Sequence, residues 1–336
     1  MKRYLSLFVV GVLFVLAVFA GFWKLPYYAL GPGPAREVEP LIKVSGHPTY
    51  GSSGKLIMTT VAYYQATPLT ALEAWLNPDK TLVPTSTFLG GQSAQQEHVR
   101  AISEMDQSKI DASVVALTAL TNYPKDAGTG ALVEATLPGC PADGKLFAGD
   151  LVTQIDGKPI ASRQAASDAI DAVPPGKPIV FTITAVGQTH RLTLTRAMCP
   201  APFDKRPYVG VTLIENFPFG IQISSGDIGG PSAGLMYALG LYNVLTPGDL
   251  TGGRTIAGTG TISMDGTVGP IGGIADKVVA ARHAGASIFL VPKQNMTELQ
   301  GVDTGTMKLV PVGTFQDALT ALGVPAVPST KTKVAA

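Results

Sequence analysis

The stretch that decides the fold reads GGPSAG, from Gly229 to Gly234, and it opens the most apolar helical segment beyond the N-terminal region, residues 231–245. Pro231 suits the first turn of a helix, where its missing amide hydrogen would have no partner in any case. The small neighbours leave room for a substrate backbone near Ser232, and the free amide groups of a helix start can stabilise an oxyanion. An ordinary glycine-rich helix start has the same pattern. The stretch alone therefore leaves a nucleophilic serine and a structural turn equally open.

A serine nucleophile needs a base, and Lys277 is the better of two candidates. It lies on a predicted helix over 273–284, and its neighbours three and four positions away are small or apolar: Gly273, Ile274, Ala280 and Ala281. A lysine on such a face loses hydration, which lowers its pKa and makes the neutral amine available as a general base. A lysine that extends from the helix edge into water is the simpler interpretation of the same pattern. His283 lies beside Arg282 on the exposed-looking end of this helix and is interpreted as a surface histidine.

Composition and charge exclude several classes of function. The 336 residues predict two domains with further segments. Twenty-five Lys and Arg against 24 Asp and Glu give a net charge of +1, so no basic excess exists to bind nucleic acid. The chain lacks the G-x-x-x-x-G-K-S/T phosphate loop, which excludes an ATPase of that type, and none of its four histidines has a second at metal-ligand spacing. We therefore expect no metal and no cofactor.

The N-terminal region predicts a membrane anchor. Residues 4–23 contain no charged side chain, and 20 residues at a rise of about 1.5 Å span the hydrocarbon core of a bilayer. Lys2 and Arg3 precede this segment, which predicts a single-pass protein of the cell membrane with a cytoplasmic N-terminus and the rest of the chain outside. A cleaved signal peptide is the alternative. Either export route permits a disulfide between Cys140 and Cys199, which their spacing does not establish.

Beyond this segment the chain divides into regions that differ in composition and in hydrophobic pattern. The GPGP stretch at 31–34 predicts a stiff exit from the membrane, and a folded region is expected from about Leu41. Apolar residues at helical spacing predict a long helix over 94–121. Residues 130–195 combine short β-branched runs, an Asp-Gly turn pair and a single helix, which predicts a separate β-rich module. Strands and helices then alternate, and the small polar residues at 324–336 are expected to be disordered.

The β-rich module resembles a PDZ domain. GALV at 130–133 matches the loop and strand whose backbone receives a peptide end, and PADG at 141–144, GDLV at 149–152 and IDG at 155–157 match the bacterial form of the family. The resemblance implies that an extended peptide pairs with an open strand edge, bound through Gly130, Ala131, Leu132 and Val133. A module that only packs against the rest of the chain is the alternative.

The stretch from Ser232 onward resembles the proteolytic domain of Lon-type serine peptidases. The matching motifs occur in the family's order and near its spacing: GPSAG at 230–234, TGTI at 259–262, GPIGGI at 269–274 leading to Lys277, and VPKQN at 291–295. The resemblance implies that Ser232 attacks the peptide carbonyl and that Lys277 activates the serine. It also implies that Thr259 supports the lysine through a hydrogen bond.

The chain departs from that family at two positions. The family commonly has an acidic residue three positions before the serine, where this chain has Gly229, and a glutamate where this chain has Thr261. Asp227 lies close by, and its equivalence to the missing acidic residue stays open. The predicted anchor, the PDZ-like insert and the missing phosphate loop together resemble bacterial membrane-anchored, PDZ-containing Lon-like peptidases rather than the ATP-driven enzymes.

The resemblance implies an α+β fold in which a PDZ-like domain is inserted into a Lon-type proteolytic domain. The predicted order is a transmembrane anchor at 4–23, the N-terminal part of the peptidase region at 36–124, the PDZ-like domain at 125–198, the Lon-type proteolytic domain at 205–323 and a disordered tail at 324–336.

The predicted function is that of an ATP-independent serine endopeptidase that cleaves flexible or partly unfolded extracytoplasmic proteins and recognises peptides through its PDZ-like module. Its partners are thus a protein or peptide substrate and the membrane. A non-catalytic, membrane-tethered adaptor that binds peptides is the alternative from another class, and a serine hydrolase with His283 as its base is a further one. The natural substrate, the cleavage preference and the oligomeric state are not predicted by the sequence.

Overall fold

The computed structural model describes residues 4, 11, 18–185 and 187–325. Most of the predicted anchor at 4–23, and all but the first two residues of the predicted tail at 324–336, lie outside this part of the chain. Within it, no helix combines the length and the apolar character that are needed to cross a membrane.

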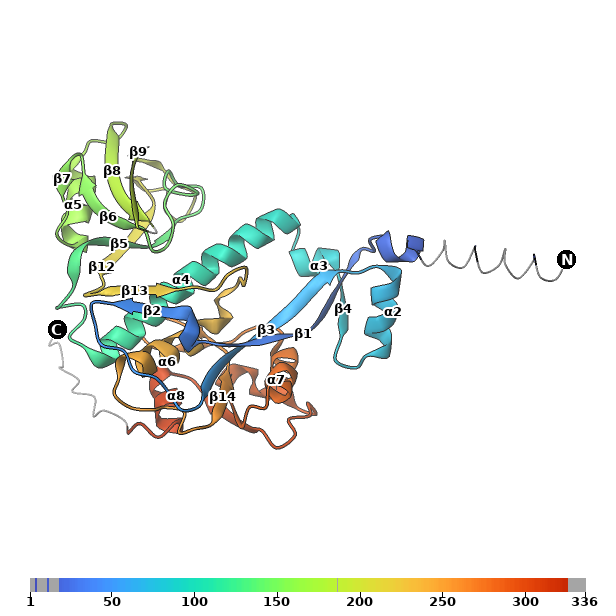
Figure 1. Cartoon of the computed structure of the whole chain (residues 1–336). Helices are drawn as coiled ribbons and strands as arrows, with labels where there is room; N and C mark the ends of the chain where they lie inside the picture. The colour runs from blue at the N-terminus through green and yellow to red at the C-terminus, as the bar shows by residue number, and fades with distance from the viewer. Residues whose placement is uncertain (1–3, 5–10, 12–17, 186, 326–336) are drawn as a thin grey trace.

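Six strands form the main sheet, in the order β18-β17-β14-β3-β1-β4 (Figure 1). They are β1 (Tyr27–Glu37), β3 (Lys55–Gln65), β4 (Thr81–Pro84), β14 (Thr255–Gly258), β17 (Ile288–Pro292) and β18 (Lys308–Val312). β3, β14, β17 and β18 run parallel, whereas β1 is antiparallel to both of its neighbours. Because β3 pairs with β14, the segments before and after the β-rich module share one sheet. This sheet already begins at Tyr27, earlier than the predicted boundary at residue 36.

The GPGP stretch at 31–34 lies inside β1 and not in a separate exit segment. The pairing of β1 with β3 shifts its register between Pro32 and Ala35, and such a bulge is one of the few places where a strand accepts proline. Gly33 lies against the neighbouring strand, where an added Cβ would be 2.8 Å from the carbonyl oxygen of Thr60. The stretch is therefore shaped by strand pairing.

Alternating residues of the central strands divide the core between the two faces of the sheet. Leu56 and Met58 of β3 pack on one face, with α4 (Ala94–Leu120), α6 (Gly234–Leu245) and α8 (Phe315–Ala321). Ile57 packs on the other face with α7 (Ile274–His283). α6 is apolar on nearly all sides and is accordingly buried along almost its whole length. Short 3-10 helices accompany these elements: η1 (Glu39–Leu41), η2 (Pro231–Ala233) and η3 (Lys293–Leu299).

The far ends of β1 and β3 carry an extension on the side of the molecule where the N-terminus lies (Figure 1). It consists of β4 and two short helices, α2 (Pro68–Leu76) and α3 (Thr85–Leu89). Phe88 of α3 packs against two tyrosines, with ring centroids 4.4 Å from Tyr28 and 5.0 Å from Tyr63. These aromatic contacts fix the extension to the two long strands.

The β-rich module is a second sheet with strand order β12-β5-β6-β8-β9 and a single helix. Its elements are β5 (Gly128–Thr136), β6 (Leu151–Ile155), β7 (Lys158–Pro159), which pairs with β6, α5 (Arg163–Ala172), β8 (Pro178–Ala185), β9 (Gln188–Thr195) and β12 (Val211–Asn216). The predicted end at residue 198 is too early, because β12 returns to pair with β5. A disulfide between Cys140 and Cys199 ties this returning segment to the loop after β5.

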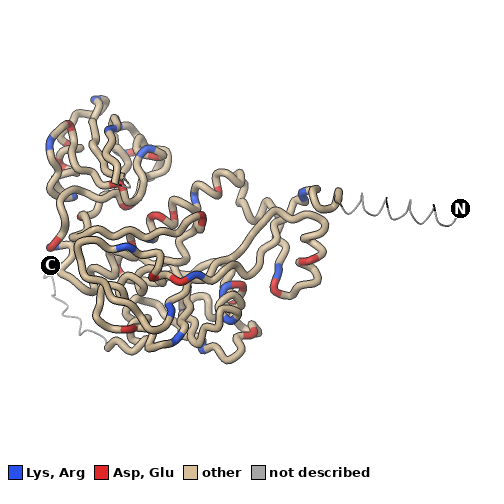
Figure 2. Tube along the Cα trace, in the orientation of Figure 1, with Lys and Arg blue, Asp and Glu red and all other residues tan. Residues whose placement is uncertain are grey.

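Small two-stranded sheets connect the regions. β2 (Ile42–Ser45) pairs with β13 (Gly220–Ile223), β10 (Ala197–Met198) with β11 (Pro207–Tyr208), and β15 (Thr261–Ile262) with β16 (Val268–Gly269). Acidic and basic side chains are interspersed along the described part of the trace (Figure 2), consistent with the net charge of +1.

The module packs through apolar side chains on the layers formed by the main sheet and its helices. Leu132 and Phe217 belong to the same core cluster as α4 and α6, and Leu151 and Ile214 pack against it. The α4 helix contacts β5 of the module as well as α6 and η2 of these layers. One long helix thus joins the module to the centre of the molecule.

Candidate active site

Ser232 lies in η2, the short turn that leads into α6. The α4 helix holds this turn from the side: the amide of Gly230 donates to the carbonyl oxygen of Ala101 at 2.7 Å, and the hydroxyl of Ser108 donates to the carbonyl oxygen of Pro231 at 3.0 Å. Gly230 has a φ of 87°, in the left-handed region that favours glycine. The glycines around the serine therefore serve a tight turn.

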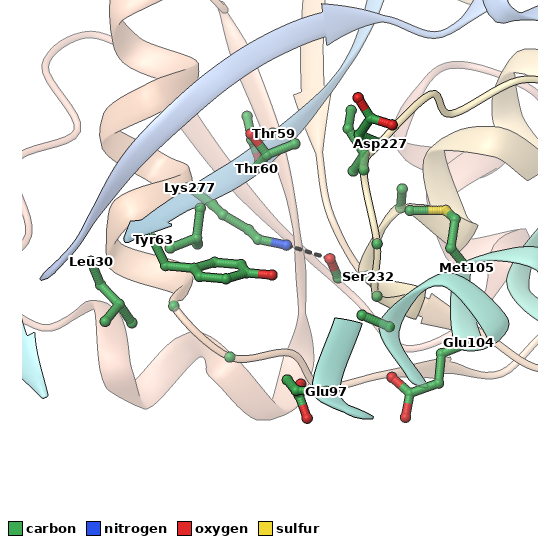
Figure 3. Close-up of a pocket in the computed structure, with 18 of the residues that line it drawn as sticks. Leu30, Thr59, Thr60, Tyr63, Glu97, Glu104, Met105, Asp227, Ser232 and Lys277 are labelled. Atoms are coloured by element: carbon green, nitrogen blue, oxygen red, sulfur yellow. Dashed lines mark hydrogen bonds between the residues drawn. The ribbon is translucent and has the colours of Figure 1, made fainter. Parts of the chain in front are cut away.

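Lys277 reaches this turn from α7 on the other side of the sheet. Its Nζ donates to Ser232 Oγ at 2.5 Å (Figure 3). It also donates to Thr259 Oγ1 at 3.1 Å. The hydroxyl of Thr259 donates in turn to the carbonyl oxygen of Ser232 at 2.9 Å, and the amide of Gly260 donates to the same oxygen at 2.8 Å. Because Thr259 directly follows β14, the three side chains meet at the carboxyl end of that strand.

Burial decides the protonation of Lys277. The residue is 3 % exposed, and this loss of hydration lowers the pKa of its amine from 10.5 to about 8. Among the ion pairs of the described residues, none involves Lys277. A substantial fraction of the amine is therefore neutral near pH 8, and a neutral amine 2.5 Å from a hydroxyl can take its proton.

A cavity of about 490 Å³ opens beside the Ser232–Lys277 pair (Figure 3). Its apolar lining comes largely from the N-terminal segment and α4: Leu30, Pro34, Val61, Tyr63, Phe88, Ala101, Met105 and Ile228. Three carboxylates, those of Glu97, Glu104 and Asp227, also line it. A cavity of this size can hold several residues of an extended peptide next to the serine.

The two departures from the Lon pattern have different structural outcomes. A Cβ at Gly229 would lie 2.8 Å from the Cβ of Ala101, so no side chain fits at this position without a shift of α4. Asp227 lines the cavity two residues earlier and is exposed. Within the described residues, no hydrogen bond links Asp227 to Ser232 or Lys277. Thr261 lies in β15 and pairs with Gly269.

The other predicted base lies elsewhere. His283 is the last residue of α7, is exposed and does not line the cavity. A serine hydrolase that uses this histidine is therefore incompatible with the structure. In the described part of the chain, no group of three or more His, Cys, Asp or Glu residues is arranged to hold a metal ion.

The predicted peptide-binding edge at Gly130, Ala131, Leu132 and Val133 is wrong. These residues lie in β5, which pairs with β6 on one side and with β12 on the other. All four are buried. The backbones of Ala131, Leu132 and Val133 already pair with β12, and those of Ala131 and Leu132 also pair with β6. Leu132 packs toward the peptidase core and not into a groove. The outer strands of the module are β12 and β9.

Several residues of the site were not singled out by the sequence. Tyr63 and Phe88 come from segments more than 140 residues before Ser232, and no local pattern marks them as cavity walls. Ser108 also supports the site, since it holds the turn at Pro231 from the middle of α4. It differs from these two residues in its signal, because the MDQS stretch at 105–108 faintly resembles the helix that precedes the active site of Lon-type peptidases.

Comparisons with known proteins identify the region around the site. Residues 214–322 match the family model of the Lon protease (S16) C-terminal proteolytic domain. Lon protease 2 of Bacillus subtilis (strain 168) is 34 % identical over 128 residues, which are 38 % of this chain and 21 % of that protein. Lon protease of Trichlorobacter lovleyi is 38 % identical over 93 residues, 27 % of this chain and 11 % of that protein. The chain thus covers about a fifth or less of these relatives.

Residues 214–322 are therefore similar to a Lon-type proteolytic domain, which is a serine-peptidase domain. Solved structures similar to this chain include the PDZ domain of the SdrC-like protein of Listeria innocua, 25 % identical, covering 25 % of this chain and 92 % of that one, with a TM-score of 0.23. The PDZ domain of the SdrC-like protein of Listeria monocytogenes is 26 % identical, covers 26 % of this chain and 88 % of that one, and has a TM-score of 0.23.

Proposed function

We propose that the chain is an ATP-independent serine endopeptidase in which Ser232 is the nucleophile and Lys277 its general base. One observation carries this proposal: Lys277 Nζ lies 2.5 Å from Ser232 Oγ, inside a buried hydrogen-bond network that opens into a cavity. Both residues of the pair are present and in contact, which favours an enzyme over the adaptor that only binds peptides.

The proposed reaction begins when neutral Lys277 takes the proton of Ser232 as Oγ attacks the peptide carbonyl carbon. The amide groups of Ser232 and Ala233 and the positive end of α6 stabilise the oxyanion. The C–N bond then breaks, and Lys277 returns the proton to the leaving amine. A water molecule, deprotonated by Lys277, then attacks the acyl-enzyme ester. The C–Oγ bond breaks, Lys277 returns the proton to Ser232 Oγ, and the carboxylate product leaves. Thr259 holds the amine toward the serine through its hydrogen bond.

Two further parts of the proposal are that cleavage needs no ATP and that the substrates are flexible or partly unfolded segments. The sequence contains no phosphate loop of the G-x-x-x-x-G-K-S/T type that would power unfolding. Without such a motor, the cavity accepts chains that are already extended, so we infer that substrates are flexible or partly unfolded segments.

The proposed location is the outer side of the cell membrane, with the N-terminus in the cytoplasm. The uncharged run at 4–23 and the preceding Lys2 and Arg3 support it. The disulfide between Cys140 and Cys199 also favours an oxidising compartment.

Peptide recognition by the module is proposed at β12 rather than at β5. β12 ends the strand order of the module's sheet, and α5 packs beside it. An extended chain can add to such an outer strand through backbone hydrogen bonds.

The proposal is tested on the purified full chain in detergent micelles with an unfolded fluorescent protein substrate and no nucleotide. We expect cleavage, and labelling by a fluorophosphonate that mass spectrometry maps to Ser232. The Ser232→Ala variant is the matched control and should show neither. Cleavage that persists in this variant would falsify the assignment of the nucleophile, and cleavage that requires ATP contradicts ATP independence.

A further inference from the structure

The α2 helix presents an apolar face to solvent. Leu69, Leu72, Trp75 and Leu76 are 48 %, 51 %, 78 % and 68 % exposed, respectively. Their spacings of three, four and seven residues place them on one side of the helix, whereas Ala74 is buried against the extension. A single exposed leucine is common on a protein surface, but four large apolar side chains on one nine-residue helix are not.

Backbone hydrogen bonds hold the start of α2 close to the segment that follows the predicted membrane span. The amide of Leu25 donates to the carbonyl oxygen of Ala66 at 2.7 Å, and the amide of Ala66 donates to Tyr27 at 2.8 Å. Gly21, near the end of the predicted span, lies beside Leu69 of α2, since a Cβ added at Gly21 would be 3.7 Å from Leu69 Cδ1. Between the end of the span at residue 23 and the start of β1, three residues can bridge only about 10 Å. A chain anchored at 4–23 therefore brings α2 to the membrane surface.

Charge and aromatic content around this face match the interfacial layer of a bilayer. Phe22 and Trp23 at the end of the predicted span are exposed, as is Tyr27 at the start of β1. Aromatic side chains of this kind gather at headgroup level. The one charged residue of α2, Glu73, forms an ion pair with Lys80 at 2.5 Å. The face itself therefore carries no unpaired charge that would oppose insertion.

We propose that α2 lies in the interfacial layer of a lipid bilayer, with Leu69, Leu72, Trp75 and Leu76 inserted among the headgroups and upper acyl chains. This inference rests on the membrane anchor of the proposed function. A second copy of the chain is the competing occupant of the face. A stable protein interface buries about 800 Å² per partner and involves roughly 20–30 residues on each side, far more than the four side chains of this face. Continuity with the predicted span favours the bilayer.

Fluorescence of Trp75 tests the inference, because the chain has two tryptophans. The full chain with Trp23→Phe keeps Trp75 as its sole reporter and is reconstituted into vesicles of phosphatidylcholine and phosphatidylglycerol that contain lipids brominated near the headgroup. We expect the brominated lipids to quench Trp75 at least twofold and iodide to quench it weakly. Strong iodide quenching without lipid quenching overturns the inference.

A matched control places the reporter on the module. Phe147 is 58 % exposed and lies away from the extension, so the triple variant Trp23→Phe, Trp75→Phe and Phe147→Trp should be quenched by iodide and not by lipid. The double change Leu72→Glu and Leu76→Glu in the Trp23→Phe background should abolish lipid quenching while the chain still floats with the vesicles.

Three outcomes contradict the inference in different ways. A chain that floats but leaves Trp75 open to iodide overturns the inference alone. Shielding of Trp75 that disappears when the protein is diluted in the bilayer assigns the face to a second copy. A chain that does not float overturns both the anchor and the inference, while peptidase activity, measured on the same preparation, tests the catalytic proposal separately.

Discussion

The peptidase layers and the boundary with the β-rich module bury polar groups in different ways. At the active site, Lys277, Thr259 and Ser232 bond to one another around a cavity. At the boundary, Asp111 of α4 has a buried carboxyl oxygen with no hydrogen-bond partner among the described residues, and burial followed by the charge of Glu134 raises the pKa of Asp111 to about 7. Buried polar groups that converge on a reachable nucleophile indicate chemistry, whereas an isolated buried carboxyl indicates sensitivity to pH.

The largest expected effect comes from removing either member of the Ser232–Lys277 pair. Ser232→Ala and Lys277→Ala should each lower kcat/KM on an unfolded substrate at least about 10³-fold, because nucleophile and base act as a unit whose losses do not add. The double variant should therefore be no worse than either single one. Circular dichroism checks that the fold is retained, and turnover near the original rate in a folded variant contradicts the pair.

A second change should raise stability while it removes activity. The folded pKa of Lys277, about 8, lies below its ordinary value of 10.5, so the unfolded chain binds the proton more tightly. At pH 7 this difference costs about 3 kcal/mol, and the cost disappears as the pH rises from about 8 to 10.5. Lys277→Met should therefore raise the free energy of unfolding by about 3 kcal/mol at pH 7 and by little near pH 10, measured by denaturant titration. A gain that is independent of pH argues for better packing instead.

The third prediction concerns the activity of the unmodified chain. Since the neutral amine is the base, kcat/KM should rise about tenfold between pH 7 and pH 9 and level off above the pKa of about 8. A substrate without groups that titrate in this range isolates the enzyme's own profile. A flat profile would mean that the lysine is already neutral at pH 7 or is not the base.

The smallest effect concerns the boundary. The pKa of Asp111 is raised from 3.8, so the folded chain holds the proton more tightly and loses stability as the pH rises from about 4 to about 7. Asp111→Asn cannot ionise and should stabilise the fold at pH 8, with almost no gain at pH 4. Because Asp111 is only partly buried and solvent screens its charge, we expect a gain of roughly 1–2 kcal/mol, less than the full pKa shift would give. Thermal unfolding at the two pH values measures this. Burial also raises the pKa of the neighbouring Glu134. The Glu134→Gln variant therefore serves as a control.

The active site was easier to predict from the sequence than the sheet pairings. A glycine-rich helix start marks Ser232 locally, whereas a small-residue helix face alone does not choose Lys277, and only the spacing of the Lon-type motifs linked the two. The edge at 130–133 was misassigned because strand pairing is not local. β12 lies about 80 residues beyond β5, and no pattern in either strand indicates that the other is its partner. The prolines at 32 and 34 suggested a stiff exit from the membrane rather than a strand, since the bulge that accommodates them depends on the partner strand.

The pairing of β3 with β14 has a consequence for how the chain is made. Met58 pairs with Gly258, so two hundred residues are synthesised between the two halves of this ladder. During that interval β3 has an unpaired edge toward β14, which is the kind of surface that recruits other chains. Non-local parallel pairing also slows folding, because the loop must close before the contacts form. The module is complete once β12 is made, so it can fold first and shorten the effective loop between β3 and β14. The module would then assist the folding of the nascent chain, whether or not it binds a peptide.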